Sequence, residues 1–267
     1  MTLFQAIVLG IIQGLSEFLP ISSSAHLALT PWLLHWPEPG LSFDVALHTG
    51  TLVAVLAYFR AEWIRLIRAA WEIVTTRKVA TESQKRVVLL LIATIPGGIA
   101  GLLLDKYAET TFRAPALIAW AMIILGILLW LADRGAREVR TLSDMKPGDA
   151  LFIGIAQIFA LIPGVSRSGS TITAGLADRF DRESAAVFSF LMSMPIIAAA
   201  AVLKVPHVLH EQGLSAALVA GVLASAISGW LAIAALLRYV TRRSYGVFAL
   251  YRVLAGVAVL VIVHYRA

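Results

Sequence analysis

The segment Pro163-Gly-Val-Ser-Arg-Ser-Gly-Ser-Thr171 is polar, yet it lies between two apolar runs. Its Arg167 is the only basic residue between Lys146 and Arg179. Pro163 ends the preceding apolar run, and the serines can cap a helix that follows. A guanidinium, several hydroxyls and a helix N-terminus together suit a phosphate or diphosphate ligand. The alternative is a polar turn whose arginine reaches toward lipid headgroups.

The composition is that of a membrane protein. Of 267 residues, 59% are hydrophobic and 14% are charged, and the mean hydropathy is +0.83. Soluble domains are about half apolar and about a quarter charged, so we expect an all-α polytopic membrane protein. The net charge of +6 is then assigned to cytoplasmic loops rather than to nucleic-acid binding. The absence of cysteine excludes a thiolate nucleophile, a thiolate metal site and a disulfide.

Two pairs of short apolar segments are each interrupted by a proline. Residues 3–19 and 21–36 flank Pro20, and residues 149–162 and 166–178 flank Pro163. No member of either pair comfortably spans about 30 Å of hydrocarbon, so each pair is predicted to form a re-entrant helical hairpin. Between and after them we expect an amphipathic helix from 60 to 71 and full spans at 42–59, 87–104, 114–132, 184–204, 215–237 and 247–265.

This order is a hairpin plus three spans, followed by a second hairpin plus three spans. Gly10-Ile-Ile-Gln13 resembles Gly154-Ile-Ala-Gln157, and each is followed by a proline and then serines. An odd number of spans per half inverts the second half relative to the first. We therefore expect one membrane domain, 1–267, built from two inverted-topology repeats, 1–132 and 149–267, with six full spans and four half-helices.

The distribution of Lys and Arg orients this arrangement. Of 22 such residues, 16 fall on one side of the predicted membrane, 4 on the other, and the last two are Arg167 and Arg252. The positive-inside rule makes the richer side cytoplasmic and places both termini outside. The hairpins then enter from opposite sides, and their tips are expected to meet near the midplane, where inverted-repeat proteins place their sites.

The first hairpin also carries polar residues. Gln13 and Glu17 are four residues apart, so they share a helix face. An acid inside an apolar segment is costly and indicates function by default. The alternative for Glu17 is an ion pair that ties the two repeats together. His26 follows three serines, and its alternative is a hydrogen-bonded structural histidine.

The chemistry predicted for these residues is phosphoryl transfer. Arg167 would neutralise a phosphoryl group, and His26 could act as acid, base or nucleophile. A serine could attack or hold the phosphate, while Glu17 could orient His26, activate water or bind a divalent cation. The catalytic candidates are Glu17, His26, Ser23 and Arg167. The phosphate-binding candidates are Ser22, Ser24, Ser166, Arg167, Ser168 and Thr171, and the metal-binding candidates are Glu17 and Gln13.

Two motifs carry a family resemblance. Gln13-x-x-x-Glu17 followed by Pro20-x-Ser-Ser-x-x-His26, with the distal Pro163-Gly-x-Ser-Arg-Ser-x-x-Thr171, resembles the undecaprenyl-diphosphate phosphatase (bacitracin resistance) family, and the resemblance covers the whole chain. It implies removal of one phosphate from a polyprenyl diphosphate, which regenerates the lipid carrier for peptidoglycan. It also implies a bacterial cytoplasmic membrane location, a site open to the outer side, and a divalent cation such as Mg²⁺ or Ca²⁺.

The sequence departs from the family pattern at Gln13, where many relatives have Glu, so metal binding by two carboxylates is in question. His48 stands where some relatives have Gln; it lines the site or is a polar contact between helices. A second family, related to phosphatidic acid phosphatases, does not match, because Thr173 stands where that family's Ser-Arg motif requires His and no Pro-Ser-Gly-His is present.

Two functions of other classes are also compatible with the sequence. A transporter or flippase of the same carrier lipid is one, because paired re-entrant hairpins are typical of transporters. A small-ion channel or exchanger is the other, although serines with His26 and Arg167 resemble a phosphoryl site more than a conduction path. The sequence does not decide whether the chain forms a homodimer.

The topology can be tested with reporter fusions. Reporters placed after Arg77 and Arg140 should report the cytoplasm, and a reporter after Glu109 should report the outside, because the Lys and Arg residues concentrate on the first side. The opposite pattern would invert the protein in the membrane.

Overall fold

The computed structural model describes residues 1–109, 111–135 and 140–266, and the side chains within these ranges except at 41–42, 105–109, 111 and 207–212. Every named element in this part of the chain is a helix. Arg137, in the predicted loop 133–148, and the side chain of Lys106 lie outside what is described.

The four short segments predicted around Pro20 and Pro163 are confirmed as helices, in two pairs. The first pair is α1, Leu3–Phe18, and α2, Ser23–Leu34; the second is α7, Pro147–Ile158, and α8, Arg167–Ala177. Serine caps begin α2 and α8: Ser22 accepts from the N–H of Ala25, and Ser166 accepts from the N–H of Gly169. Both caps have positive φ, 78° and 75°, which is unusual for serine and is held by the surrounding structure.

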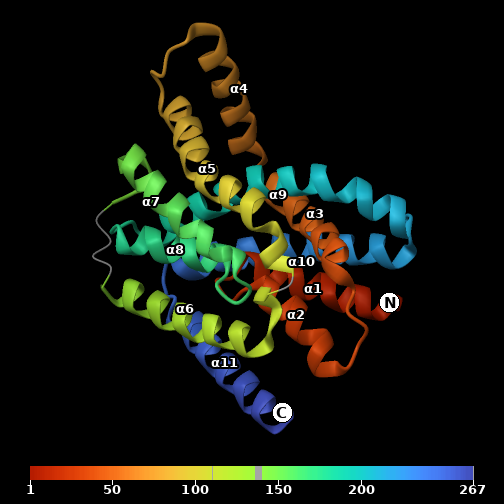
Figure 1. Cartoon of the computed structure of the whole chain (residues 1–267). Coiled ribbons are helices and arrows are strands. Elements are labelled where there is room, and N and C mark those ends of the chain that lie inside the picture. Colours follow the sequence, from red (N-terminus) through yellow and green to blue (C-terminus); the bar gives the residue numbers. More distant parts are fainter. Residues whose placement is uncertain (110, 136–139, 267) are drawn as a thin grey trace.

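The remaining helices are longer. They are α3, Gly40–Tyr58; α4, Arg60–Thr76; α5, Glu82–Glu109; α6, Pro115–Gly135; α9, Arg182–Gln212; α10, Ala216–Val240; and α11, Gly246–Arg266, with short 3₁₀ turns at Thr111–Arg113, Leu142–Asp144 and Phe159–Leu161. The helix predicted from residue 60 is confirmed as α4, which with the start of α5 projects from the rest of the molecule (Figure 1).

Five of these helices are long and apolar enough to cross a membrane: Glu82–Leu104, Pro115–Gly135, Arg182–Pro206, Ala216–Val240 and Gly246–Arg266. The span predicted at 42–59 coincides with α3, but its described apolar part, Phe43–Tyr58, is shorter than these five. A sixth span therefore stays a prediction. Large apolar side chains such as Leu102, Leu231 and Leu254 are exposed on these helices, as expected of surfaces that contact lipid.

Each hairpin packs its first helix closely against a long helix of the other half. Helix α1 lies on α10, and α7 lies on α5. Glycines make the approach close: a Cβ on Gly14 would lie 2.4 Å from the carbonyl oxygen of Ser225, and one on Gly154 would lie 2.5 Å from that of Ala93. Gly14 and Gly154 thus allow both hairpins to pack directly against helix backbones.

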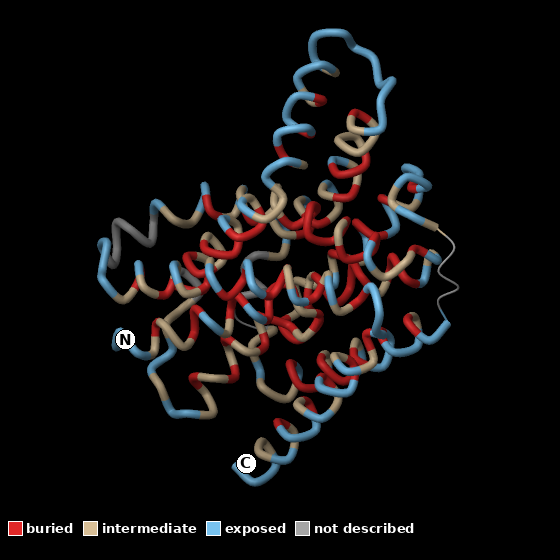
Figure 2. The backbone as a smooth tube through the Cα atoms, turned by 180° about the vertical axis from the view of Figure 1, so that it is seen from behind, coloured by how far each residue is buried: buried red, intermediate tan, exposed pale blue. Residues whose placement is uncertain are grey.

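Buried residues concentrate in the middle of the molecule (Figure 2).

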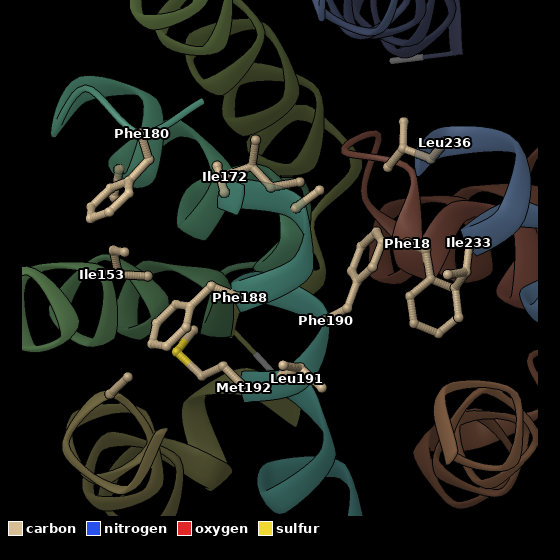
Figure 3. Close-up of a cluster of buried hydrophobic side chains, with 14 of the residues drawn as sticks. Phe18, Ile153, Ile172, Phe180, Phe188, Phe190, Leu191, Met192, Ile233 and Leu236 are labelled. Atoms are coloured by element: carbon tan, nitrogen blue, oxygen red, sulfur yellow. The ribbon is translucent and has the colours of Figure 1, made fainter. Parts of the chain in front are cut away.

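Aromatic packing joins the end of α1 to α9. Phe18 meets Phe190 edge-on, with ring centroids 5.3 Å apart, and Ile233 of α10 lies beside them (Figure 3). This contact places the end of α1, and with it Glu17, against the second half of the chain.

The close approach of α1 to α10 predicts a stability effect. Gly14→Ala should destabilise the protein by about 1–3 kcal/mol, because the added methyl group overlaps packed backbone. The measurement is Tm in detergent. Gly98→Ala is the matched control, since a Cβ on this helical glycine meets nothing within 4 Å, and it should leave Tm equal or higher. Equal melting of both variants would contradict the close packing.

Candidate active site

The two hairpin tips contact each other, as the sequence predicted. The hydroxyl of Ser22 accepts a hydrogen bond from the backbone N–H of Gly164 at 3.1 Å. Ser168 donates to the carbonyl of Leu19 at 3.3 Å. The caps of α2 and α8 therefore lie side by side, and the polar segments of both halves meet there.

Glu17 and Arg167 form an ion pair across this junction. Arg167 Nη2 donates to Glu17 Oε1 at 2.8 Å, and Nη1 donates to the carbonyl of Ser189 at 2.8 Å. Ser23 donates to the other carboxylate oxygen, Oε2, at 2.6 Å, and Gln13 Nε2 donates to it at 3.1 Å. Glu17 is only 6% exposed. The structure thus brings together Gln13, Glu17, Ser23 and Arg167.

The histidine beside Glu17 is His48 of α3. Its Nε2 lies 3.4 Å from Glu17 Oε2, and its Nδ1 donates to the carbonyl of Asp44 at 2.7 Å. The sequence left two roles open for His48: a residue that lines the site or a polar contact between helices. In the structure it lines the site.

Orientation of His26 was one of three roles left open for Glu17, but both ring nitrogens of His26 have other partners. Its Nδ1 donates to the carbonyl of Ser22 at 2.6 Å, and in the neutral ring its Nε2 accepts from the hydroxyl of Tyr251 at 2.7 Å. Both ring nitrogens are therefore engaged. Tyr251 gave no signal in the sequence, because only the fold brings α11 next to α2.

The remaining candidate hydroxyls bond mainly within the two tips. Ser24 Oγ lies 3.3 Å from Ser22 Oγ, and Ser166 Oγ lies 3.2 Å from Ser168 Oγ. Thr171 donates to the carbonyl of Arg167 at 2.8 Å and pairs with a hydroxyl of α9, that of Ser189, at 2.7 Å. These groups hold the shape of the helix starts around the ion pair.

Arg252 of α11 binds the backbone of both tips. Its side chain is fully buried and donates to the carbonyls of Pro20 at 3.0 Å, Gly164 at 2.6 Å and Val165 at 2.9 Å. A fourth bond, at 3.2 Å, goes to Met122. The signal for Arg252 in the sequence is its position as a lone charge within an apolar span.

A cavity of about 240 Å³ adjoins the ion pair. Its polar lining includes Glu17, His48, Gln157 and Arg167. Its apolar lining comes from α3, from the turn after α7, and from α9: Val45, Ala160, Leu161, Ile196, Ile197 and Ala200. A cavity with a charged end and an apolar wall suits an amphiphilic anion.

A divalent cation has few ligands in this site. Among the described residues, no group of three or more His, Asp or Glu side chains could hold a metal ion. Glu17 is a single carboxylate, while the buried Gln13 Oε1 has no hydrogen-bond partner within the described part of the chain. One carboxylate and one amide oxygen fit Mg²⁺ when substrate phosphate and water complete its shell, which is the usual way Mg²⁺ is held.

Comparison with known proteins points to one family. The family model described as "Bacitracin resistance protein BacA" matches residues 6–258. The "Undecaprenyl-diphosphatase" of Gemmatimonas aurantiaca is 59% identical over 259 residues, which cover 97% of each chain. Relatives with the same name from Moorella thermoacetica and Pelotomaculum thermopropionicum are 51% and 49% identical, each over at least 97% of both chains. Matches over nearly the whole length show that the chain belongs to the BacA bacitracin resistance protein family.

Proposed function

We propose that this protein hydrolyses undecaprenyl diphosphate to undecaprenyl phosphate and inorganic phosphate, which recycles the lipid carrier for peptidoglycan synthesis and confers bacitracin resistance. The observation that carries the proposal is the direct contact of Glu17 with both Arg167 and Ser23, beside a cavity with an apolar wall. The names of relatives that match almost the whole chain support the same activity.

Arg167 is the residue that binds the terminal phosphate. Its two bonds, to Glu17 and Ser189, leave further N–H groups for phosphate oxygens. The starts of α2 and α8 add partial positive charge at the junction of the two tips, where the candidate hydroxyls lie: Ser22, Ser24, Ser166, Ser168 and Thr171. Buried Arg252 adds a second positive charge beside the tips. The surplus of positive charge favours a diphosphate.

Ser23 is the nucleophile in this proposal, and Glu17 is its base. The 2.6 Å hydrogen bond already directs the Ser23 proton to the carboxylate. Ser23 Oγ attacks the terminal phosphorus, its proton passes to Glu17, and the bond to the bridging oxygen breaks, which releases the lipid monophosphate. Water then attacks the phosphoserine, and protonated Glu17 returns its proton to the Ser23 oxygen as the P–O bond breaks. The protons of that water remain on the inorganic phosphate, so Ser23 and the Glu17 carboxylate are both regenerated. Arg167 stabilises the charge on the phosphoryl oxygens in both steps.

The two histidines have different parts in this mechanism. His48 lies near enough to Glu17 to influence its charge and orientation. His26, proposed from the sequence as an acid–base residue, is here a positioning residue that holds the start of α2 through Ser22 and Tyr251. A divalent cation, held by Glu17 and Gln13 together with the substrate, would neutralise phosphate oxygens.

The proposal includes two inverted repeats, both termini outside, and a site that opens to the outer side of the bacterial cytoplasmic membrane. The mirrored packing of α1 on α10 and of α7 on α5 supports the repeats. So do the matched serine caps with positive φ and the paired glycine contacts. The split of Lys and Arg residues supports the orientation.

Transport of the carrier lipid is the second candidate, favoured by the paired broken helices. The purified protein in detergent, given farnesyl diphosphate, distinguishes the two functions. Release of inorganic phosphate supports hydrolysis, whereas binding without release would favour transport.

The role of Arg167 predicts a graded loss of turnover. Arg167→Lys should lose most activity, at least tenfold in kcat/KM, because lysine cannot bind a phosphate through a planar fork. Arg167→Ala should lose essentially all activity, measured as phosphate release from folded protein. Near-normal turnover of the alanine variant would remove Arg167 from the site.

The proposed proton transfer predicts a ranking of variants. Ser23→Ala and Glu17→Gln should each abolish turnover, since one lacks the attacking oxygen and the other lacks the base. Gln13→Ala should cost less, because its neutral amide positions Glu17 and offers a cation only one uncharged oxygen. Because Glu17→Gln lacks the base, excess Mg²⁺ should not restore its turnover; partial rescue would mean that Glu17 acts mainly by holding a cation. A Gln13→Ala variant as inactive as Ser23→Ala would contradict the ranking.

A further inference from the structure

Gln157 is the one residue in the cavity lining whose buried side-chain amide lacks any protein partner within the described part of the chain. It is 4% exposed, and neither Nε2 nor Oε1 has a hydrogen-bond partner there. It lines the same cavity as Glu17 and Arg167. An unpaired buried amide is costly, so a group that is absent from the protein itself is expected to satisfy it.

Comparison with Gln13 explains why the amide of Gln157 is free. Gln13 and Gln157 occupy the same place in the motifs Gly10-Ile-Ile-Gln13 and Gly154-Ile-Ala-Gln157. Gln13 donates to Glu17, four residues later. The residue four positions after Gln157 is Leu161, which has no acceptor in its side chain. The second hairpin therefore has the amide without the acid.

The neighbouring helix leaves room for this amide. A Cβ on Gly97 of α5 would lie 2.2 Å from Gln157 Nε2. Only a glycine at position 97 leaves room for the Gln157 side chain in its observed conformation. The cavity is thus lined by a glutamine whose side-chain amide has no partner in the described part of the chain.

The surroundings of Gln157 indicate which part of the substrate it meets. The residues that follow it, Ala160 and Leu161, form part of the apolar wall, together with Ile196 and Ile197 of α9. The charged end of the cavity is formed by Glu17 and Arg167. A prenyl diphosphate that presents its terminal phosphate to Arg167 and its tail to the apolar wall has its lipid-linked phosphate between them.

We propose that Gln157 binds the phosphate that remains on the lipid, with Nε2 donating to one of its non-bridging oxygens. This inference rests on the proposed function, because it assumes that the terminal phosphate lies at Arg167. Gln157 is then a binding residue shared by the substrate and the lipid monophosphate product. It makes no contact with the inorganic phosphate that is released.

The test is Gln157→Leu, assayed with farnesyl diphosphate in detergent. Loss of a hydrogen bond to a charged oxygen should raise KM about tenfold and leave kcat within about twofold. Inhibition by farnesyl phosphate should weaken by the same factor, while inhibition by inorganic phosphate should not change. Ser193→Ala is the matched control, since its hydroxyl lines the same cavity but already donates to the carbonyl of Phe190 at 2.6 Å.

Each contrary result has a distinct meaning. Unchanged KM and unchanged inhibition by farnesyl phosphate in a folded variant would overturn the proposal. So would a fall in kcat alone, or an equal loss of inhibition by inorganic phosphate, because both place Gln157 at the terminal phosphate. Should the leucine variant fail to fold, Gln157→Met provides the same comparison. Failure of the wild-type protein to release phosphate would instead refute the proposed function.

Discussion

The structure depends on how two helix breaks are accommodated in the interior of a membrane protein. Each break at a hairpin tip frees backbone carbonyls and N–H groups that lipid cannot satisfy. Arg252 resolves this for both tips at once, since its guanidinium bonds to the carbonyls of Pro20, Gly164 and Val165. The cap of the first tip adds the complementary bond, from the N–H of Gly164 to Ser22. One side chain from the last helix thus holds together two turns from opposite halves of the chain.

With the tips held in this way, an acid and a base can be buried as partners. A buried ion pair contributes favourably only when its remaining hydrogen-bonding groups are also satisfied. Gln13 and Ser23 donate hydrogen bonds to the carboxylate of Glu17, and the carbonyl of Ser189 accepts one from the guanidinium of Arg167. The alternative explanation of Glu17, an ion pair that ties the two repeats together, requires this contact with Arg167. A structural ion pair does not account for the adjoining cavity, where the amide atoms of Gln157 have no partner among the described residues.

Local chemistry in the sequence was sufficient to predict the helix breaks and the meeting of Glu17 with Arg167. Prolines and serines act on the residues next to them, and polar groups in hydrocarbon must find one another. Local chemistry could not predict that His48, rather than His26, lies beside Glu17. The spacing of His26 from Ser22 and Ser23 is compatible with one helix face. Only the packing of α11 shows that the Tyr251 hydroxyl hydrogen-bonds to His26 Nε2. The contacts of Arg252 and His48 likewise depend on how distant helices pack, which local patterns do not encode.

The ion pair joins residues that are 150 positions apart in the chain. A ribosome therefore releases Glu17 well before Arg167. Until the second half emerges, the carboxylate has no cation to meet it, and an unpaired acid at the centre of a bilayer costs about 3 kcal/mol on insertion scales. The favourable place for the nascent first hairpin is the lipid–water boundary, where the acid keeps its hydration. In the proposed topology, synthesis of the second half supplies the cation that allows the hairpin to bury its acid, and a chain truncated before Arg167 lacks that partner.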